Sequence, residues 1–215
     1  MTRASVLAVV VGVGLGALSR DAGAGPPSGP RFAVAPLSRV ERQALSSREL
    51  VSRPLRFRHG PTGSYVGGVS YLVVHAEPLQ VLTALADAES LPHALPSTES
   101  ATMLSRDGRR ARVELVQGKA PFLARYTLVL EQAESGNAIR FWLDPSRPHD
   151  IRDVWGFFRV EPFGAGKSLV TVAAACDMGP GIARALFEDR VERTILRTPS
   201  RIRSFVEPLA LSSSK

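Results

Sequence analysis

The sequence predicts an α+β fold in which an antiparallel β-sheet packs against one long C-terminal helix. Three pairs of stretches rich in β-branched and aromatic residues are each joined by a short turn-forming segment, a pattern typical of β-hairpins. Across residues 180–208, apolar side chains recur every three, four or seven residues, which predicts a helix. Pro199 lies within this spacing and should kink or divide the helix, because proline removes a backbone hydrogen-bond donor.

The other elements complete the order strand, helix, six strands and helix. Residues 65–75 have strand composition, and the pair Gly67 and Gly68 suggests either a bulge or a close backbone approach. A helix should begin at Pro78, since proline suits a first helical turn, and end before the prolines of residues 91–97. The six later strands form hairpins around three turns, at Asp107-Gly108, residues 133–137 and residues 164–167.

The turn at residues 164–167 shares Gly-Ala-Gly-Lys-Ser with the end of a nucleotide-binding P-loop. Glu161 occupies the position of that motif's first glycine, and a β-branched segment follows Ser168 where the motif requires a helix. ATP binding is therefore not predicted, and the glycines serve a tight turn.

Residues 1–24 have the pattern of a signal peptide. Arg3 precedes an apolar run over residues 6–18, which is short for a transmembrane helix. Ala22 and Ala24 are small residues at the two positions that a signal peptidase reads. We expect cleavage after Ala24 and an exported protein, periplasmic or secreted; an uncleaved N-terminal anchor is the alternative.

Beyond the signal peptide, composition divides the chain into three parts. Residues 25–63 read as a linker that begins with a Pro/Gly/Ser spacer, contains a short helix marked by the Ser38–Glu41 capping box, and ends in a basic connector over residues 53–63. The main domain is expected at residues 64–208, followed by a tail at 209–215.

Composition and motifs exclude several classes of function. The chain has 215 residues and a formal charge of +7, but no recognisable nucleic-acid-binding module, so no nucleic-acid partner is predicted. Cys176 is the single cysteine, which excludes an internal disulfide and suggests a small buried apolar residue. No metal-binding spacing of histidines or cysteines is present, so neither a metal nor another cofactor is predicted. The oligomeric state is left open.

The order of elements resembles the helix-grip fold of the START/Bet v 1-like (SRPBCC) superfamily, and within it the bacterial polyketide cyclase/dehydrase-like group. The resemblance rests on residues 73–97, on the aromatic strands within residues 122–177, and on residues 181–207. It covers residues 64–208. It implies a curved antiparallel sheet wrapped around a long C-terminal helix, with a cavity between them that takes sterols, lipids, polyketides or other apolar molecules.

The resemblance leads to three hypotheses of function. The first is an exported carrier that binds a small hydrophobic molecule, lipid or polyketide-like, without covalent chemistry. The second is a cyclase- or dehydratase-type enzyme using the same cavity, which a pocket holding His75, or Tyr126 beside Arg125, would favour. No catalytic residue is identified for it. The third is an envelope interaction or scaffold domain with a filled core and no ligand.

Aromatic, polar and apolar side chains of the late strands and the last helix are the candidates for the cavity. Alternation along a strand places Trp155 and Phe158 on opposite faces of the sheet, and likewise Arg125 and Tyr126, without showing which face lines the cavity. Each aromatic can instead be plain core, and Arg125 can be an exposed residue paired with a neighbouring strand. The candidate ligand-binding residues are Tyr126, Arg125, Trp142, Trp155, Phe158, Phe187 and Val191.

Loops and a basic stripe suggest how a ligand would enter. The loops at residues 91–97 and 145–150 and the glycine pair near residue 67 are candidate gates, because loops move more readily than the scaffold. Arg193, Arg197 and Arg201 follow one another at four-residue spacing and could meet an anionic membrane surface. The alternative is a solvated helix face partly paired with nearby acids.

Overall fold

The computed structural model describes residues 34–212, apart from the side chains of residues 182–186. The predicted signal peptide and the Pro/Gly/Ser spacer lie outside the described residues. The helices are α1 (Arg39–Ser46), α2 (Pro78–Ala86), α3 (Leu91–Ala94), α4 (Ile182–Leu196) and α5 (Thr198–Ser212). The strands are β1 (Val51–His59), β2 (Gly63–Val74), β3 (Thr98–Asp107), β4 (Arg110–Lys119), β5 (Phe122–Gln132), β6 (Ala138–Leu143), β7 (Asp153–Pro162) and β8 (Ser168–Asp177).

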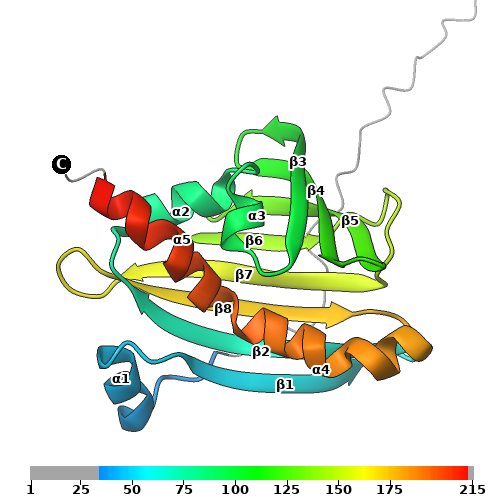
Figure 1. Cartoon of the computed structure of the whole chain (residues 1–215), viewed down its shortest axis with the longest axis horizontal. Coiled ribbons are helices and arrows are strands. Elements are labelled where there is room, and N and C mark those ends of the chain that lie inside the picture. Colours follow the sequence, from blue (N-terminus) through cyan, green and yellow to red (C-terminus); the bar gives the residue numbers. More distant parts are fainter. Residues whose placement is uncertain (1–33, 213–215) are drawn as a thin grey trace, which may run out of the picture.

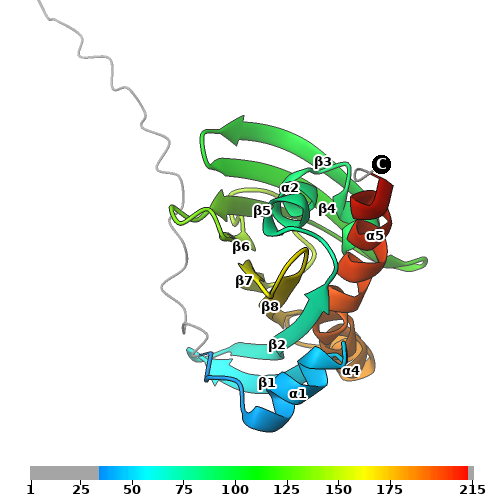
Figure 2. The same ribbon diagram turned by 90° about the vertical axis from the view of Figure 1, so that its left-hand side faces the viewer.

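The strands form one eight-stranded antiparallel sheet in the order β1-β2-β8-β7-β6-β5-β4-β3. Strands β3 to β8 are a meander of hairpins, and β2 joins its end by pairing with β8. Figure 1 shows α4 and α5 running across one face of the sheet. Figure 2 shows the sheet bent into a trough, with these helices along its open side. The predicted α+β helix-grip architecture is confirmed.

Strand β1 corrects the expectation of a basic connector over residues 53–63. Its residues pair with β2 in continuous register, from Val51 opposite Tyr71 to His59 opposite Gly63. β1 is an edge strand, where Pro54 and charged side chains are tolerated because one side of the ladder faces no further strand. The arginines of this segment obscure its alternation in the sequence.

Helix α1 also belongs to the folded unit rather than to a linker. The Ser38 hydroxyl accepts a hydrogen bond from the backbone N–H of Glu41, and the Glu41 carboxylate accepts one from the backbone N–H of Ser38, which confirms the predicted capping box. Leu45 is fully buried against Val51 and Tyr71 on the convex face of the sheet. The compact fold therefore begins before residue 64.

The glycine pair in β2 marks a close backbone approach and not a bulge. Gly67 and Gly68 pair in regular register with both neighbouring strands. A Cβ atom on Gly67 would lie 1.9 Å from the carbonyl oxygen of Ala174, and one on Gly68 would lie 2.2 Å from that of Arg53. The glycines thus allow β2 to run close to its neighbours.

The remaining helices differ in detail from expectation. Helix α2 begins at Pro78 as predicted, and the single turn α3 forms where a loop was expected. The C-terminal helix is divided into α4 and α5 at Arg197, as the position of Pro199 predicts; Pro199 lies in the first turn of α5, where its missing N–H is not needed. Helix α5 continues to Ser212, so much of the expected tail is helical.

Candidate ligand-binding site

A cavity of about 440 Å³ lies between the concave face of the sheet and helix α4. Its volume falls in the range of pockets that hold small molecules. Strands β4 to β8 supply its floor, and α4 and the start of α5 cover it. The lining is mainly apolar and includes Leu115, Leu128, Phe141, Val172 and Ile195.

A row of small residues across three strands lowers the cavity floor. Ala174 of β8 pairs with Gly68 of β2 on one side and with Gly156 of β7 on the other. The phenyl ring of Phe141 lies over Gly156, since a Cβ there would be 2.5 Å from the ring's Cζ atom. No side chain in this row is larger than a methyl group, and Ala174 at its centre lines the cavity.

Four of the predicted residues line the cavity. Tyr126 and Phe158 project from the sheet, and Phe187 and Val191 project from α4. The Phe158 ring packs against that of Phe141, with centroids 5.0 Å apart. In the aromatic strand β7, the face that carries Phe158 is therefore the inner one.

The other three predicted residues lie elsewhere, so their assignment to the cavity is wrong. Arg125 is exposed and pairs with Glu114 at 2.8 Å, which was the stated alternative. Trp142 and Trp155 face each other in register on the convex side. Strand alternation explains all three positions. Each residue is next in sequence to a residue that lines the cavity, namely Tyr126, Phe141 or Val154, and consecutive residues of a strand point to opposite faces.

The two tryptophans contribute to packing outside the cavity. The guanidinium of Arg110 lies 6.0 Å from the centre of the Trp142 ring. Trp155 meets the rings of Phe57 and Tyr65 edge-on, with centroid distances of 6.3 Å and 6.4 Å. The convex face thus holds its own aromatic contacts, separate from the cavity.

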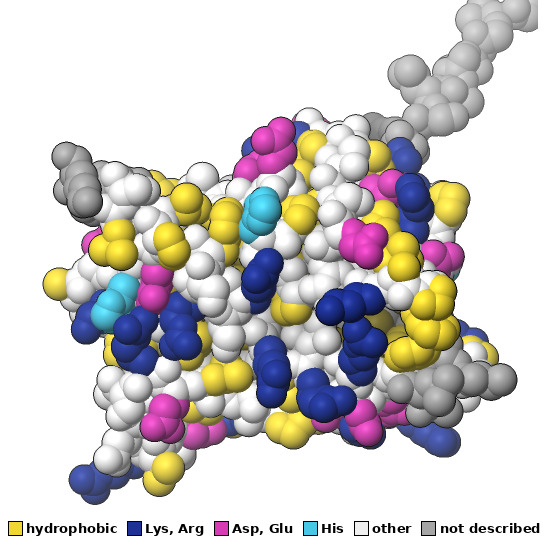
Figure 3. All heavy atoms as spheres, viewed as in Figure 1, with side chains coloured by type: hydrophobic (Ala, Val, Ile, Leu, Met, Phe, Trp, Pro, Cys, Tyr) yellow, Lys and Arg dark blue, Asp and Glu magenta, His cyan; other side chains and the backbone are white. Residues whose placement is uncertain are grey.

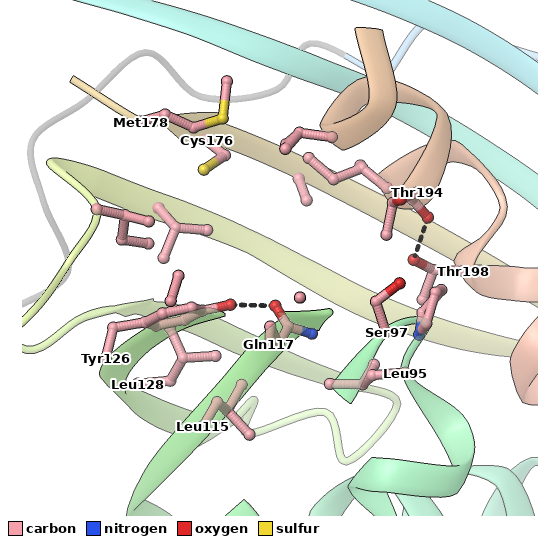
Figure 4. A pocket seen from close by; sticks show the side chains of 18 of the residues that line it. Leu95, Ser97, Leu115, Gln117, Tyr126, Leu128, Cys176, Met178, Thr194 and Thr198 are labelled. Carbon is pink, nitrogen blue, oxygen red and sulfur yellow. Dashed lines mark hydrogen bonds between the residues drawn. The ribbon is translucent and has the colours of Figure 1, made fainter. Parts of the chain in front are cut away.

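The main polar feature of the cavity is a hydrogen-bonded chain that includes Gln117. The Tyr126 hydroxyl donates to Oε1 of Gln117, whose Nε2 donates to Oγ1 of Thr98 at 2.7 Å. Figure 4 shows Tyr126 and Gln117 joined in this way, with Ser97 and Thr198 beyond Gln117. The amide of Gln117 has a second hydrogen with which to bind a ligand oxygen.

Gln117 was not among the predicted residues, although the sequence carries a signal for it. Val113, Leu115 and Gln117 occupy alternate positions on one side of β4, so a polar residue continues an otherwise apolar inward row. Thr194 and Thr198 were missed as well; the Thr198 hydroxyl donates to the backbone oxygen of Thr194 at 3.2 Å. Such residues are common in cores, and only the position of the cavity sets them apart.

Burial keeps Tyr126 and Cys176, the two buried titratable groups of the described lining, neutral. Burial raises the pKa of Tyr126 well above its ordinary range. Burial, together with the carboxylates of Asp177 and Asp153, raises the pKa of the Cys176 thiol to about 12. The tyrosine is therefore a hydrogen-bond donor, and the cysteine behaves as a small apolar group beside Met178 (Figure 4).

The mouth of the cavity lies between the β4–β5 hairpin and α4. Phe122 and Leu123 at the hairpin are 60% and 42% exposed. The centroid of the Phe122 ring lies 4.8 Å from that of the Phe187 ring. Lys119 and Arg190 also line this end and are exposed. Figure 3 shows basic and hydrophobic side chains side by side where the hairpin approaches α4.

Two of the three candidate gates border the cavity. Leu91, Leu95 and Ser97 from the first loop and Asp150 from the second are part of its lining. The Gly67–Gly68 segment does not contribute side chains to it. A ligand would thus pass near the loops before β3 and β7 and the β4–β5 hairpin.

Two further features concern metals and membranes. Within residues 34–212, no three histidine, cysteine or acidic side chains lie close enough together to hold a metal ion. In the same described part of the chain, no helix combines the length and apolar character that a membrane span requires.

The sequence matches a family model described as polyketide cyclase / dehydrase and lipid transport over residues 69–202, more than half of the chain. The protein belongs to this family. No curated protein matches it. The family assignment confirms the resemblance on which the helix-grip prediction rests.

Several solved structures share the fold of this family member. The Zhui aromatase/cyclase from Streptomyces sp. R1128 is 14% identical with a TM-score of 0.56, covering 77% of this chain and 97% of its own. A STAR-related lipid transfer protein from Xanthomonas axonopodis is 16% identical with a TM-score of 0.56, and the match covers 71% of this chain and 98% of that protein's chain. The human StarD13 lipid transfer and protein localization domain is 12% identical with a TM-score of 0.53, and the match covers 81% of this chain and 100% of that domain's chain. At these identities the likeness shows the fold alone.

Proposed function

We propose that the protein binds a small hydrophobic molecule, lipid or polyketide-like, in the cavity between the sheet and helices α4 and α5. The observation that carries this proposal is the largely apolar cavity of about 440 Å³. The family description, which names lipid transport beside cyclase and dehydrase activity, is consistent with it. Burial of apolar ligand surface would supply affinity, at roughly 25 cal/mol per Å² before the costs of association.

The polar chain at Tyr126 and Gln117 would orient the ligand within the cavity. Both side chains point toward the same apolar space, and Gln117 can donate its second amide hydrogen to a carbonyl or hydroxyl oxygen. Because an unpaired polar group in such a site costs about 1–3 kcal/mol, a ligand that offers an oxygen there is favoured over a plain hydrocarbon.

Binding is better supported than catalysis by the groups that face the cavity. Tyr126 and Cys176 remain protonated at neutral pH, since burial raises both pKa values. Arg125 faces outward, and His75 is exposed and is not part of the lining. Neither arrangement that would favour a cyclase or dehydratase, His75 in the pocket or Tyr126 beside Arg125, is found in the lining formed by the described residues.

The test is native mass spectrometry of the protein expressed in its own host, followed by solvent extraction of bound material. A stoichiometric adduct that the extract identifies as a lipid or polyketide-like molecule would establish the carrier function. A bare chain that takes up nothing from a host lipid extract would contradict the proposal. Turnover of an extracted molecule would instead assign an enzyme.

We also propose that the protein is exported and meets an anionic membrane surface. The pattern of residues 1–24 supports export, and the exposed side chains of Arg193, Arg197 and Arg201 support contact with acidic lipids. N-terminal sequencing of envelope material should begin at Gly25, and an intact Met1 on cytoplasmic protein would contradict export. Co-sedimentation with phosphatidylglycerol vesicles should weaken when the three arginines are replaced by alanine.

A further inference from the structure

Polarity rises along β4 from the inner part of the cavity to its mouth. Leu115, Gln117 and Lys119 lie two residues apart, so they share the inward side of the strand, and all three line the cavity. Leu115 is 1% exposed, Gln117 is half-buried and Lys119 is exposed. The strand thus presents an apolar, then a neutral polar, then a cationic side chain.

The helical side of the cavity shows the same gradient. Thr198, Thr194 and Arg190 are four residues apart and all line the cavity. Thr198 is 6% exposed, Thr194 is half-buried and Arg190 is exposed. Both the strand and the helical side therefore present a cation at the mouth, where the rings of Phe122 and Phe187 join the hairpin to α4.

The acidic groups near the mouth already have partners. Asp150 is the one carboxylate in the described lining, and its Oδ2 accepts the backbone N–H of Arg125 at 2.8 Å. On α4, the guanidinium of Arg56 pairs with the carboxylates of Glu188, Asp189 and Glu192 at 3.6 Å, 2.7 Å and 2.5 Å. The three acids of α4 are thus paired with β1, and the two cations of the described lining, Lys119 and Arg190, outnumber its single carboxylate, Asp150.

We propose that the ligand is an anionic amphiphile, an apolar body with a carboxylate or phosphate group, bound with its anionic group between Lys119 and Arg190. This inference rests on the proposed function and specifies its ligand class. The apolar body would lie against Ala174, Phe141 and Leu128, and any oxygen midway would face Gln117. Ammonium and guanidinium groups form charge-assisted hydrogen bonds to such anions, and arginine can bind them through two parallel bonds.

The test uses three probes of equal chain length, lauric acid, its methyl ester and dodecyl phosphate, each displacing a neutral apolar fluorophore from the full-length protein. We expect the wild type to bind the acid about tenfold more tightly than the ester. Lys119→Ala and Arg190→Ala should each weaken binding of the acid about fivefold and leave the ester unchanged. The stronger response of the acid or of the phosphate identifies which anion the mouth accepts.

Matched controls separate this inference from the proposed function. Arg140→Ala and Lys167→Ala remove exposed cations of the same types that do not line the cavity and should change nothing. If the fluorophore binds but acid and ester compete equally, the anionic ligand is refuted while the cavity function stands. If no probe binds, both fail. Loss of vesicle binding in the two mouth variants, with an unchanged acid-to-ester ratio, would assign the cations to a membrane surface and overturn the inference.

Discussion

Replacing Ala174 by phenylalanine distinguishes an open cavity from a filled core. Ala174 faces the cavity, and its cross-strand neighbours there are Gly68 and Gly156. Ala173, the preceding residue, is also fully buried but faces the convex cluster, where its neighbours are Val69 and Phe157. The two positions therefore share strand, residue type and burial, and differ in the space above them.

The expected free energies follow from that difference. Full burial of a phenylalanine side chain contributes about 1.5–3 kcal/mol, whereas forcing extra atoms into a packed interior costs about 1–3 kcal/mol. With a cavity of about 440 Å³ in front of it, the new ring at Ala174 meets little overpacking. Ala174→Phe should therefore remain within about 1 kcal/mol of the wild type or be more stable. Ala173→Phe should lose about 1–3 kcal/mol.

Urea unfolding followed by circular dichroism gives the free energies, and displacement of a neutral fluorophore gives the binding. Ala174→Phe should fold normally and bind the fluorophore at least tenfold more weakly, because the ring occupies the ligand's space. If Ala174→Phe were as destabilising as Ala173→Phe, the space would be filled in solution. That result would refute the cavity and favour the scaffold hypothesis.

Three further predictions concern the frame around the cavity. Gly67→Ala should cost about 2–4 kcal/mol in urea unfolding, since its Cβ would lie 1.9 Å from the oxygen of Ala174 and its φ is 154°; an unchanged midpoint would contradict the close approach. Arg56 pairs with acids of α4, the helix that covers the cavity, so Arg56→Ala should loosen α4 and speed fluorophore release about two- to threefold. Arg109→Ala, which removes an exposed ion pair with Glu134 away from α4, is the control and should leave release unchanged. A hydrogen bond from a neighbouring arginine lowers the pKa of Glu41 from 4.5 to about 2. Its stabilising contribution is thus complete above pH 4.5 and lost as pH falls toward 2, and Glu41→Gln should flatten this part of the stability curve.

Much of the fold could be predicted because its elements follow local rules. The hairpin turns, the start of α2 at Pro78 and the helix division near Pro199 each depend on a few neighbouring residues. Strand β1 was missed because its three arginines and Pro54 mimic a basic loop, and only pairing with β2 makes the segment a strand. Pairing between distant segments has no local signal.

The candidate site was predicted in part for a similar reason. Alternation divides a strand into two faces, but the direction of sheet curvature decides which face becomes concave. Phe158 and Tyr126 lie on the concave face, whereas Trp142 and Trp155, chosen for their aromatic character, lie on the convex one. The chemistry of a side chain therefore did not predict its face.

The polar gradients depend on an even longer-range relation. Gln117 and Lys119 are ordinary strand residues until α4, some 70 residues later in the chain, places Thr194 and Arg190 across the cavity from them. Neither half alone orients an amphiphile, since a single exposed cation contributes little. In the proposed binding mode both walls become more polar toward the same opening, while the small side chain of Ala174 leaves room in the interior for an apolar body. Selectivity for an anionic end and capacity for an apolar one therefore arise from the same folding of the sheet around α4.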